Sequence, residues 1–241
     1  MTLETIDIIN GILIIFILAI SLYVGLRIIS VYFKNKEKVY FFSGLLLIGI
    51  VSPWFPHTTS FILVLTTGKG LAAELYFTIG IIFIPVAIIF WLYAFTELCY
   101  KELQKIILVI YSIYAVLFYI LFFIALFTNP ILIGELEGDI EVKYSRIVVL
   151  YYLTILLTLL ITGLIFAIKS AKFENPETKL RGKLLVVAFF SYVIGIGVDA
   201  ILTHNFFTLI FVRALEMSSV IEFYAAFIMP DWVKKIFLKE K

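Results

Sequence analysis

Four polar side chains recur at every third position in the last long apolar segment: Arg213, Glu216, Ser219 and Glu222. Each residue of an α-helix advances by about 100°, so steps of three drift by about 60° and the four side chains form a slanting ridge. Charged groups within a membrane-spanning helix are costly, and they usually face the interior of the bundle or a water-filled cavity. The pattern therefore predicts a polar ridge that points into the protein.

Other polar residues are expected at the depth of Arg213 on neighbouring segments. One hypothesis is an outward-opening pocket in which Arg213, held by Glu216 or Asp199, meets a polar or anionic group of a ligand. The alternative is that Arg213 pairs with Glu216 or Asp199 only to neutralise buried charge and to fix the packing of the last helices. The further candidate ligand-binding residues at this level are Glu74, Tyr76 and His204.

Three residues are candidates for signalling or for a pathway through the protein. Glu222 and Ser219 continue the ridge into the inner half of the last segment. An isolated Glu222 is alternatively a protonated carboxylic acid, because desolvation disfavours the charged form. Pro85 frees a backbone carbonyl and predicts a kink that serves as a hinge or a cavity wall.

Residues for other kinds of chemistry are missing from the sequence. It contains no GxSxG, HExxH or phosphate-binding glycine motif, one cysteine (Cys99) and two histidines (His57 and His204). No lysine lies within 206–229, which excludes the Schiff base of an opsin-type retinal protein. We therefore expect no catalytic residue, no metal site and no cofactor, and a protein that is not an enzyme.

The composition predicts a protein of the lipid bilayer. The 241 residues are 63% hydrophobic and 15% charged, and the mean hydropathy is +1.12. A water-soluble domain typically has about 45–50% apolar and about 25% charged residues. The formal net charge of +2 gives no basic face for nucleic acid. The expected location is the cell membrane, with several passes of the chain.

The expected fold is all-α, with seven transmembrane helices. A bilayer core of about 30 Å requires about 20 apolar residues, and seven runs approach or exceed this length. The second run is broken by Pro53 and Pro56, and residues 61–65 are an outer loop, a re-entrant piece or the continuation of a kinked helix. The predicted spans are 8–31, 39–55, 71–95, 103–127, 147–168, 184–202 and 206–229.

The lysines and arginines predict the orientation. Of the 19 basic residues, only Lys69, Lys143 and Arg146 lie on one side of the predicted spans, and Arg213 lies within a span. The other fifteen lie on the opposite side or near the span ends that face it, and the positive-inside rule assigns this side to the cytoplasm. The N-terminus is then outside and the C-terminus inside. Glu4 and Asp7 precede the first span where a signal peptide has basic residues, so we expect this span to be retained.

Two parts of the chain are distinguished. Residues 1–229 are expected to form the transmembrane domain, in which segment 128–146 is an acidic outer loop. Residues 230–241 are expected to form a short basic tail, amphipathic and lying on the inner leaflet. Glycines 44, 49, 195 and 197 are expected to let neighbouring helices approach closely.

Two segments give the sequence a resemblance to a known family. They are Leu75-Tyr76-Phe77-Thr78-Ile79-Gly80 through Pro85 to Phe90-Trp91, and Phe223-Tyr224 to Phe227-Ile228-Met229-Pro230 with Trp232 and basic residues after it. With the predicted helix number and orientation, the chain resembles the seven-transmembrane N-terminal sensor modules of prokaryotic histidine kinases and related signalling proteins. The resemblance implies a module that senses a ligand or a membrane state. Because only about a dozen residues follow Met229, we expect its output to be a separate cytoplasmic signalling protein.

The leading interpretation is a membrane receptor or sensor that binds a small or lipid-like ligand in its outer half. The pocket is expected between the third, sixth and seventh spans. One alternative is a small-solute transporter, in which Arg213, Glu216 and Glu222 line a path, although no inverted repeat is visible. Another is a membrane-embedded enzyme acting on lipids.

Overall fold

The computed structural model describes residues 3–201 and 205–238, and this part of the chain is almost entirely helical. The expected all-α fold is therefore confirmed, with one short β-hairpin added. The elements in chain order are α1 (Thr5–Asn35), α2 (Lys38–Ile50), α3 (Trp54–Thr67), α4 (Ala73–Ile81), α5 (Ile84–Cys99), η1 (Lys101–Leu103), α6 (Gln104–Thr128), η2 (Pro130–Leu132), β1 (Gly134–Glu137), β2 (Glu141–Tyr144), α7 (Arg146–Ala171), α8 (Pro176–Ile201), α9 (Phe206–Ile228) and α10 (Asp231–Phe237).

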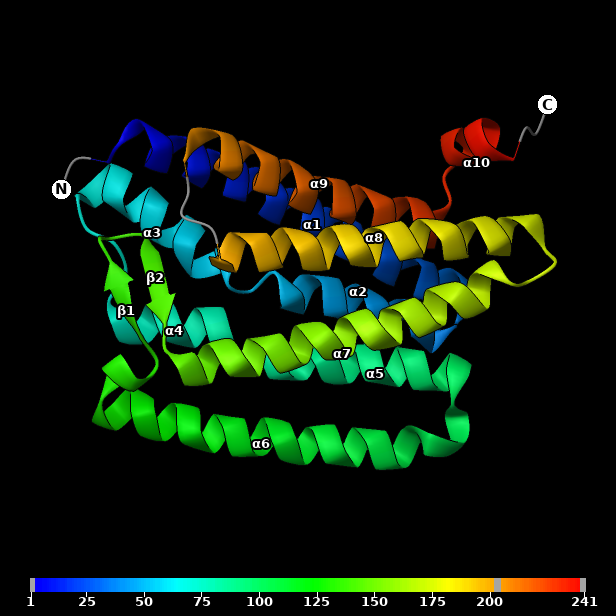
Figure 1. Cartoon of the computed structure of the whole chain (residues 1–241), viewed down its shortest axis with the longest axis horizontal. Helices are drawn as coiled ribbons and strands as arrows, with labels where there is room; N and C mark the ends of the chain where they lie inside the picture. The colour runs from blue at the N-terminus through cyan, green and yellow to red at the C-terminus, as the bar shows by residue number, and fades with distance from the viewer. Residues whose placement is uncertain (1–2, 202–204, 239–241) are drawn as a thin grey trace.

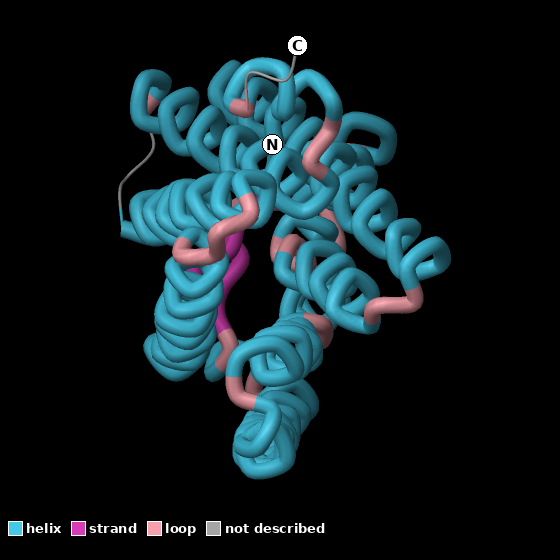
Figure 2. The backbone as a smooth tube through the Cα atoms, turned by 90° about the vertical axis from the view of Figure 1, so that its right-hand side faces the viewer, coloured by secondary structure: helices cyan, strands magenta, loops and turns pink. Residues whose placement is uncertain are grey.

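The long helices lie side by side and form a bundle. The hairpin and α3 lie at one end of it with the start of α1, and α10 lies at the other end (Figure 1). Helices α1, α2, α5, α7, α8 and α9 form a ring in which each packs against the next and α9 returns to α1. In the view along the bundle these helices surround a central gap, with the hairpin on its far side (Figure 2). Helix α6 lies outside the ring, against α5.

Several of these helices are long and apolar enough to cross a membrane. Within the described residues, five pass by length and composition: α1, the α4–α5 segment, the η1–α6 segment, α7 and α8. Helices α2 and α3 pass together and would make a sixth, bent by 45° at the break between them. Helix α9 has 23 residues and contains Arg213, Glu216 and Glu222. These charged residues lie in the interior of the helix, whereas those of α8 lie toward its two ends.

Prolines explain the breaks in two of the predicted spans. Helix α2 ends at Ile50 and α3 begins at Trp54, directly after Pro53. Of the three interpretations of residues 61–65, the structure shows helix, since they lie within α3. Pro85 occupies the first turn of α5, after a break at Ile82 and Phe83. The helix is therefore interrupted where a kink was predicted, and the Ile82 carbonyl accepts a hydrogen bond of 2.5 Å from the Tyr119 hydroxyl.

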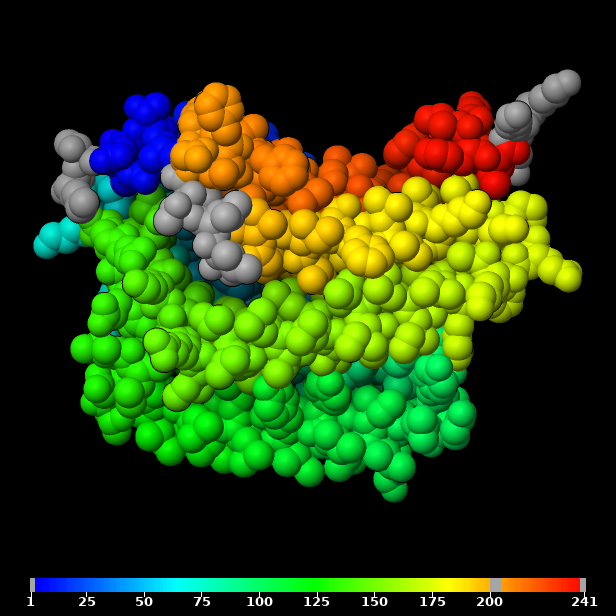
Figure 3. Space-filling model, in the orientation of Figure 1, coloured from blue at the N-terminus to red at the C-terminus, as the bar shows by residue number. Residues whose placement is uncertain are grey.

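A row of threonines on α7 forms hydrogen bonds with the neighbouring helices α5 and α6. Thr154 and Thr158 each form a 2.7 Å hydrogen bond with a tyrosine hydroxyl of α6, and Trp91 Nε1 donates to Thr162 over 2.7 Å. Interhelical bonds of this kind contribute roughly 0.6 kcal/mol each in membranes, where apolar burial gives little driving force between helices. The opposite side of α6 exposes large apolar side chains from Ile106 to Phe127. Together α6, α7 and α8 present a broad outer surface (Figure 3), which suits contact with lipid.

The segment expected to be an acidic loop contains the hairpin. Strands β1 and β2 are antiparallel, with Gly134 opposite Tyr144 and Glu137 opposite Glu141. Gly138 in the connecting turn has a φ of 72°, a left-handed conformation that glycine adopts without strain. Ile140 is buried and packs in an apolar cluster with Phe61 and Val64 of α3. The hairpin is thus fixed to the bundle.

At the opposite end, Arg181 of α8 connects three helices. Its Nη1 donates hydrogen bonds to the carbonyls of Ala226 (3.0 Å) and Phe227 (2.7 Å), which lie in the last turn of α9. Its Nη2 binds the Glu177 carboxylate at 2.7 Å, and Lys234 of α10 binds the same carboxylate at 2.9 Å. The predicted C-terminal helix is present. It is held by this network and by Val233, which is fully buried.

Candidate functional site

Helix α9 begins at a capping box formed by Asn205 and Thr208, in which the Asn205 side chain accepts a hydrogen bond from the Thr208 backbone. Side-chain oxygens at this position satisfy backbone N–H groups that have no partner within the helix. Two turns later the helix presents Arg213, which is only 4% exposed. The cap therefore fixes the part of α9 that carries the guanidinium.

Each nitrogen of the Arg213 guanidinium has a hydrogen-bond partner. Nη1 donates to Glu216 at 2.8 Å, Nη2 pairs with Asp199 of α8 at 3.1 Å, and Nε donates to Asn10 of α1 at 3.0 Å. The structure thus brings Arg213 together with both of the carboxylates proposed from the sequence. An arginine with two carboxylates offsets much of the cost of burying these charges.

Gly195 of α8 makes the close approach of Glu216 feasible. A Cβ atom at this position would lie 3.1 Å from Glu216 Cγ. Gly44 acts similarly between α2 and α1, where a Cβ would lie 2.6 Å from the Gly25 carbonyl oxygen. The expectation of close helix approach holds at both positions. It does not hold at Gly197, where no described atom lies within 4 Å of an added Cβ.

Asn10 links this ion pair to the hairpin. Its Oδ1 accepts the bond from Arg213, and its Nδ2 donates to Glu141 of β2 at 3.4 Å. A second hydrogen bond holds the hairpin: the Tyr76 hydroxyl of α4 donates to the Ile140 carbonyl at 3.0 Å. The hairpin is therefore connected to α1, α4 and, through Asn10, to α9.

A cavity of about 840 Å³ lies beneath the hairpin. This is the size of a site for a small organic molecule. Side chains from α1, the α2–α3 break, α4, α5, the hairpin, α7, α8 and α9 line it. The polar and aromatic members are Asp7, Asn10, Trp54, His57, Tyr76, Glu137, Glu141, Lys143, Tyr144, Tyr152, Tyr192, Asp199 and Arg213.

The hairpin contributes a tyrosine to the lining. Tyr144 lies in edge contact with Tyr152 of α7, with ring centroids 5.4 Å apart. Burial raises the pKa of the Tyr144 phenol to about 12, so this group is neutral at physiological pH. It can therefore donate or accept a hydrogen bond in the cavity.

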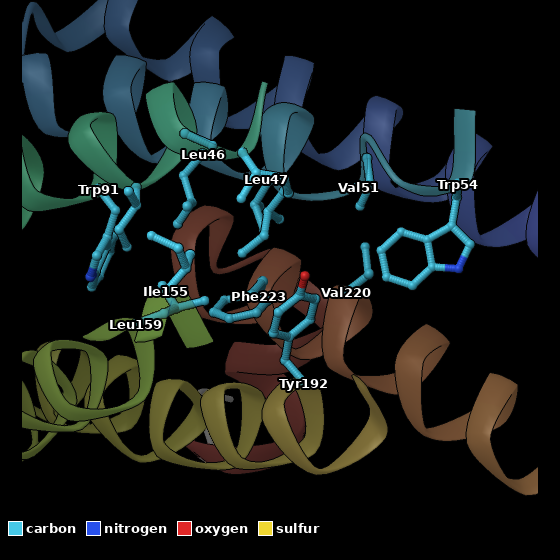
Figure 4. Close-up of a cluster of buried hydrophobic side chains, with 14 of the residues drawn as sticks. Leu46, Leu47, Val51, Trp54, Trp91, Ile155, Leu159, Tyr192, Val220 and Phe223 are labelled. Atoms are coloured by element: carbon cyan, nitrogen blue, oxygen red, sulfur yellow. The ribbon is translucent and has the colours of Figure 1, made fainter. Parts of the chain in front are cut away.

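The cavity ends on a packed apolar core. Trp54 and Tyr192 belong to the lining and also to the main buried cluster. The cluster continues from them through Val220 and Phe223 toward Trp91 (Figure 4). Trp91 and Phe189 pack with ring centroids 5.2 Å apart. Below the cavity the centre of the bundle is thus filled by interlocking side chains.

Four of the remaining candidates lie outside the cavity. Glu74 is exposed in the first turn of α4, and Pro85 is buried beside the break between α4 and α5. Ser219 is buried and donates to the Glu216 carbonyl at 2.7 Å. Glu222 is bonded to Ser218 at 3.1 Å and does not line the cavity. His204 lies outside the described residues.

Several site residues were not predicted. Asn10 lies in an apolar run, and its polarity at a buried position was the available signal. His57 was counted among the two histidines but not assigned to a site, and the structure places it in the lining. Glu141 and Tyr144 lie in the segment that was expected to be a loop.

Within the described part of the chain, no group of three or more His, Cys, Asp or Glu side chains is arranged to hold a metal ion. A comparison with models of known protein families finds none that matches this chain, and a comparison with curated proteins finds no relative. The assignment of function therefore depends on the geometry of the cavity and its surroundings.

Proposed function

We propose that this protein is a multi-pass receptor or sensor of the cell membrane that binds a small or lipid-like ligand beneath the hairpin. The seven spans are α1, the bent α2–α3 pair, α4–α5, α6, α7, α8 and α9. The hairpin end faces outward, and α10 lies at the cytoplasmic surface. A separate cytoplasmic signalling protein receives the output.

The charge distribution supports this orientation. Apart from the buried Arg213, the basic residues at the hairpin end are Lys69, Lys143 and Arg146, the first residue of α7. The connections at the α10 end are rich in lysine and arginine. Pairing of Arg213 with Glu216 and Asp199 supports α9 as the seventh span, because neutralised charges that face the bundle are tolerated in a membrane.

The observation that carries the proposal is a large cavity at one end of the bundle with a packed core below it. A transporter requires a path to the other side, and the core around Trp91, Phe189 and Phe223 fills that route. Glu222, which a transport path was expected to use, bonds to Ser218 outside the cavity. A one-sided pocket favours a receptor.

The proposal also requires a route for the signal. Arg213 joins α9 to α1 and α8 beside the cavity, and α9 runs from there to Arg181 and α10. A ligand that prefers one arrangement of α8 and α9 would increase the population of that arrangement, and α10 would move with α9. This is the coupling that we propose between pocket and output.

Ligand-screened thermal unfolding of the purified protein tests the proposal. Wild type is compared with Ile196→Trp, which fills the cavity from α8, and with Ile194→Trp, which adds the same ring at an exposed site two residues away. A compound that binds the cavity raises the unfolding temperature of wild type and Ile194→Trp but not of Ile196→Trp. Uptake of such a compound into proteoliposomes would instead identify a transporter.

A further inference from the structure

The lining of the cavity carries an excess of negative charge. Among the described residues it includes four carboxylates, Asp7, Glu137, Glu141 and Asp199, and two basic side chains, Lys143 and Arg213. Glu216 lies directly behind Arg213 and adds a further carboxylate to the buried pair. A cation in the cavity would offset this excess, and an anion would add to it.

The guanidinium of Arg213 is engaged on all three nitrogens. Its partners are Asn10, Glu216 and Asp199, at distances of 2.8 to 3.1 Å. An anionic ligand would have to displace a carboxylate from this arrangement before it could bind Arg213. Arg213 therefore serves to balance the charge of its partner carboxylates. The excess of carboxylates in the lining makes the site favour a positively charged ligand.

A second observation independently points to a ligand. His57 is buried, with 7% of its surface exposed, and it lines the cavity. Neither of its ring nitrogens has a hydrogen-bond partner among the described residues. A neutral imidazole offers one donor and one acceptor nitrogen. The acceptor suits the N–H group of a protonated amine.

The walls of the cavity fit the rest of such a ligand. Apolar side chains such as Ile14, Ile84 and Leu156 complete the lining. Faces of aromatic rings attract cations within about 6 Å of the ring centre. The aromatic residues are Trp54, Tyr76, Tyr144, Tyr152 and Tyr192.

We propose that the cavity binds an organic cation, a protonated amine attached to an apolar body. The inference rests on the proposed function and specifies the ligand class of the same site. The ammonium group is placed among the carboxylates and His57, and the apolar part lies against the aromatic and aliphatic walls.

A matched set of probes tests the ligand class. The full chain in phosphatidylcholine nanodiscs is titrated at pH 7 with 4-phenylbutylamine, 4-phenylbutan-1-ol and 4-phenylbutanoate, which differ in charge but little in shape. Binding is measured from tryptophan fluorescence, because Trp54 lines the cavity. We expect the amine to bind most tightly and the carboxylate most weakly.

Three variants test whether the lining charges are responsible. Glu137→Gln should weaken amine binding by roughly threefold, as expected for one partly solvated charge. Lys143→Gln should strengthen it by a similar factor. Glu135→Gln, on the same strand but outside the lining, should leave it unchanged.

The inference is overturned if 4-phenylbutanoate or the alcohol binds as tightly as the amine. It is also overturned if the amine does not bind, or if Glu137→Gln and Glu135→Gln have equal effects. These results would leave the proposed function standing whenever another compound distinguishes Ile196→Trp from Ile194→Trp. The proposed function itself is contradicted if no compound raises the unfolding temperature of wild type and Ile194→Trp without raising that of Ile196→Trp.

Discussion

Replacement of Arg213 by methionine removes the positive charge from a site where two carboxylates remain. Side chains of Arg213 and Glu216 are 4% and 2% exposed, and Asp199 is 25% exposed. Breaking a buried pair by deleting one partner typically costs about 3–5 kcal/mol, because the other charge is left uncompensated. We expect Arg213→Met to lower the free energy of unfolding by about 4 kcal/mol. Arg213→Lys keeps the charge but loses part of the three-way hydrogen bonding, so we expect about 2 kcal/mol.

Equilibrium unfolding in mixed detergent micelles, followed by circular dichroism, measures these losses. Adding Glu216→Gln to Arg213→Met should restore more than about 1 kcal/mol, because residues in one network do not act additively. Lys101→Met is the control: it breaks the exposed pair with Glu97, and exposed pairs contribute less than about 1 kcal/mol. If Arg213→Met resembles this control, or if the double variant is no more stable than the single one, the account of a buried and balanced ion pair is wrong.

Three further variants test the hydrogen bonds that hold the hairpin and α10 to the bundle. Asn10→Leu removes the link between Arg213 and the hairpin, so amide hydrogen exchange in β1 and β2 should accelerate; unchanged exchange would contradict the link. Tyr76→Phe deletes the bond to the Ile140 carbonyl, and a loss of about 1 kcal/mol should increase hairpin exchange by roughly fivefold. Arg181→Ala uncaps α9 and leaves the Glu177 carboxylate bound only by Lys234, so a spin label on α10 should become more mobile, whereas unchanged mobility would show that the Lys234–Glu177 pair and Val233 hold this helix without Arg181.

The sequence predicts the helices and the ion pair well, for physical reasons. Apolar runs of membrane-spanning length can only be satisfied as helices when lipid is the solvent. Arg213 had carboxylates within reach at Glu216, three residues away, and at Asp199 on the preceding segment, and both contacts are present. Pro85 was expected to kink its helix, and the helix is interrupted there.

The hairpin above the cavity and the apolar core below it could not be predicted in this way. The hairpin depends on pairing between two short strands that contain several glutamates, which are weak strand formers. Ile140 is stabilised by contacts with residues of α3 that are distant in sequence. Asn10 and His57 become site residues only when α1 and α3 meet α9 and the hairpin. The core that closes the cavity consists of apolar residues, such as Phe223 and Trp91, whose pattern does not reveal what lies above them.

The most direct test of the central claim is the accessibility of the cavity from the two sides of the membrane. In a Cys99→Ser background, Ile196→Cys places a single thiol in the lining, and Phe223→Cys places one in the core below. A membrane-impermeant thiol reagent is applied to right-side-out and inside-out vesicles. We expect labelling of Ile196→Cys only from the outside and no labelling of Phe223→Cys from either side. Labelling of Ile196→Cys from the cytoplasmic side would contradict the one-sided receptor pocket.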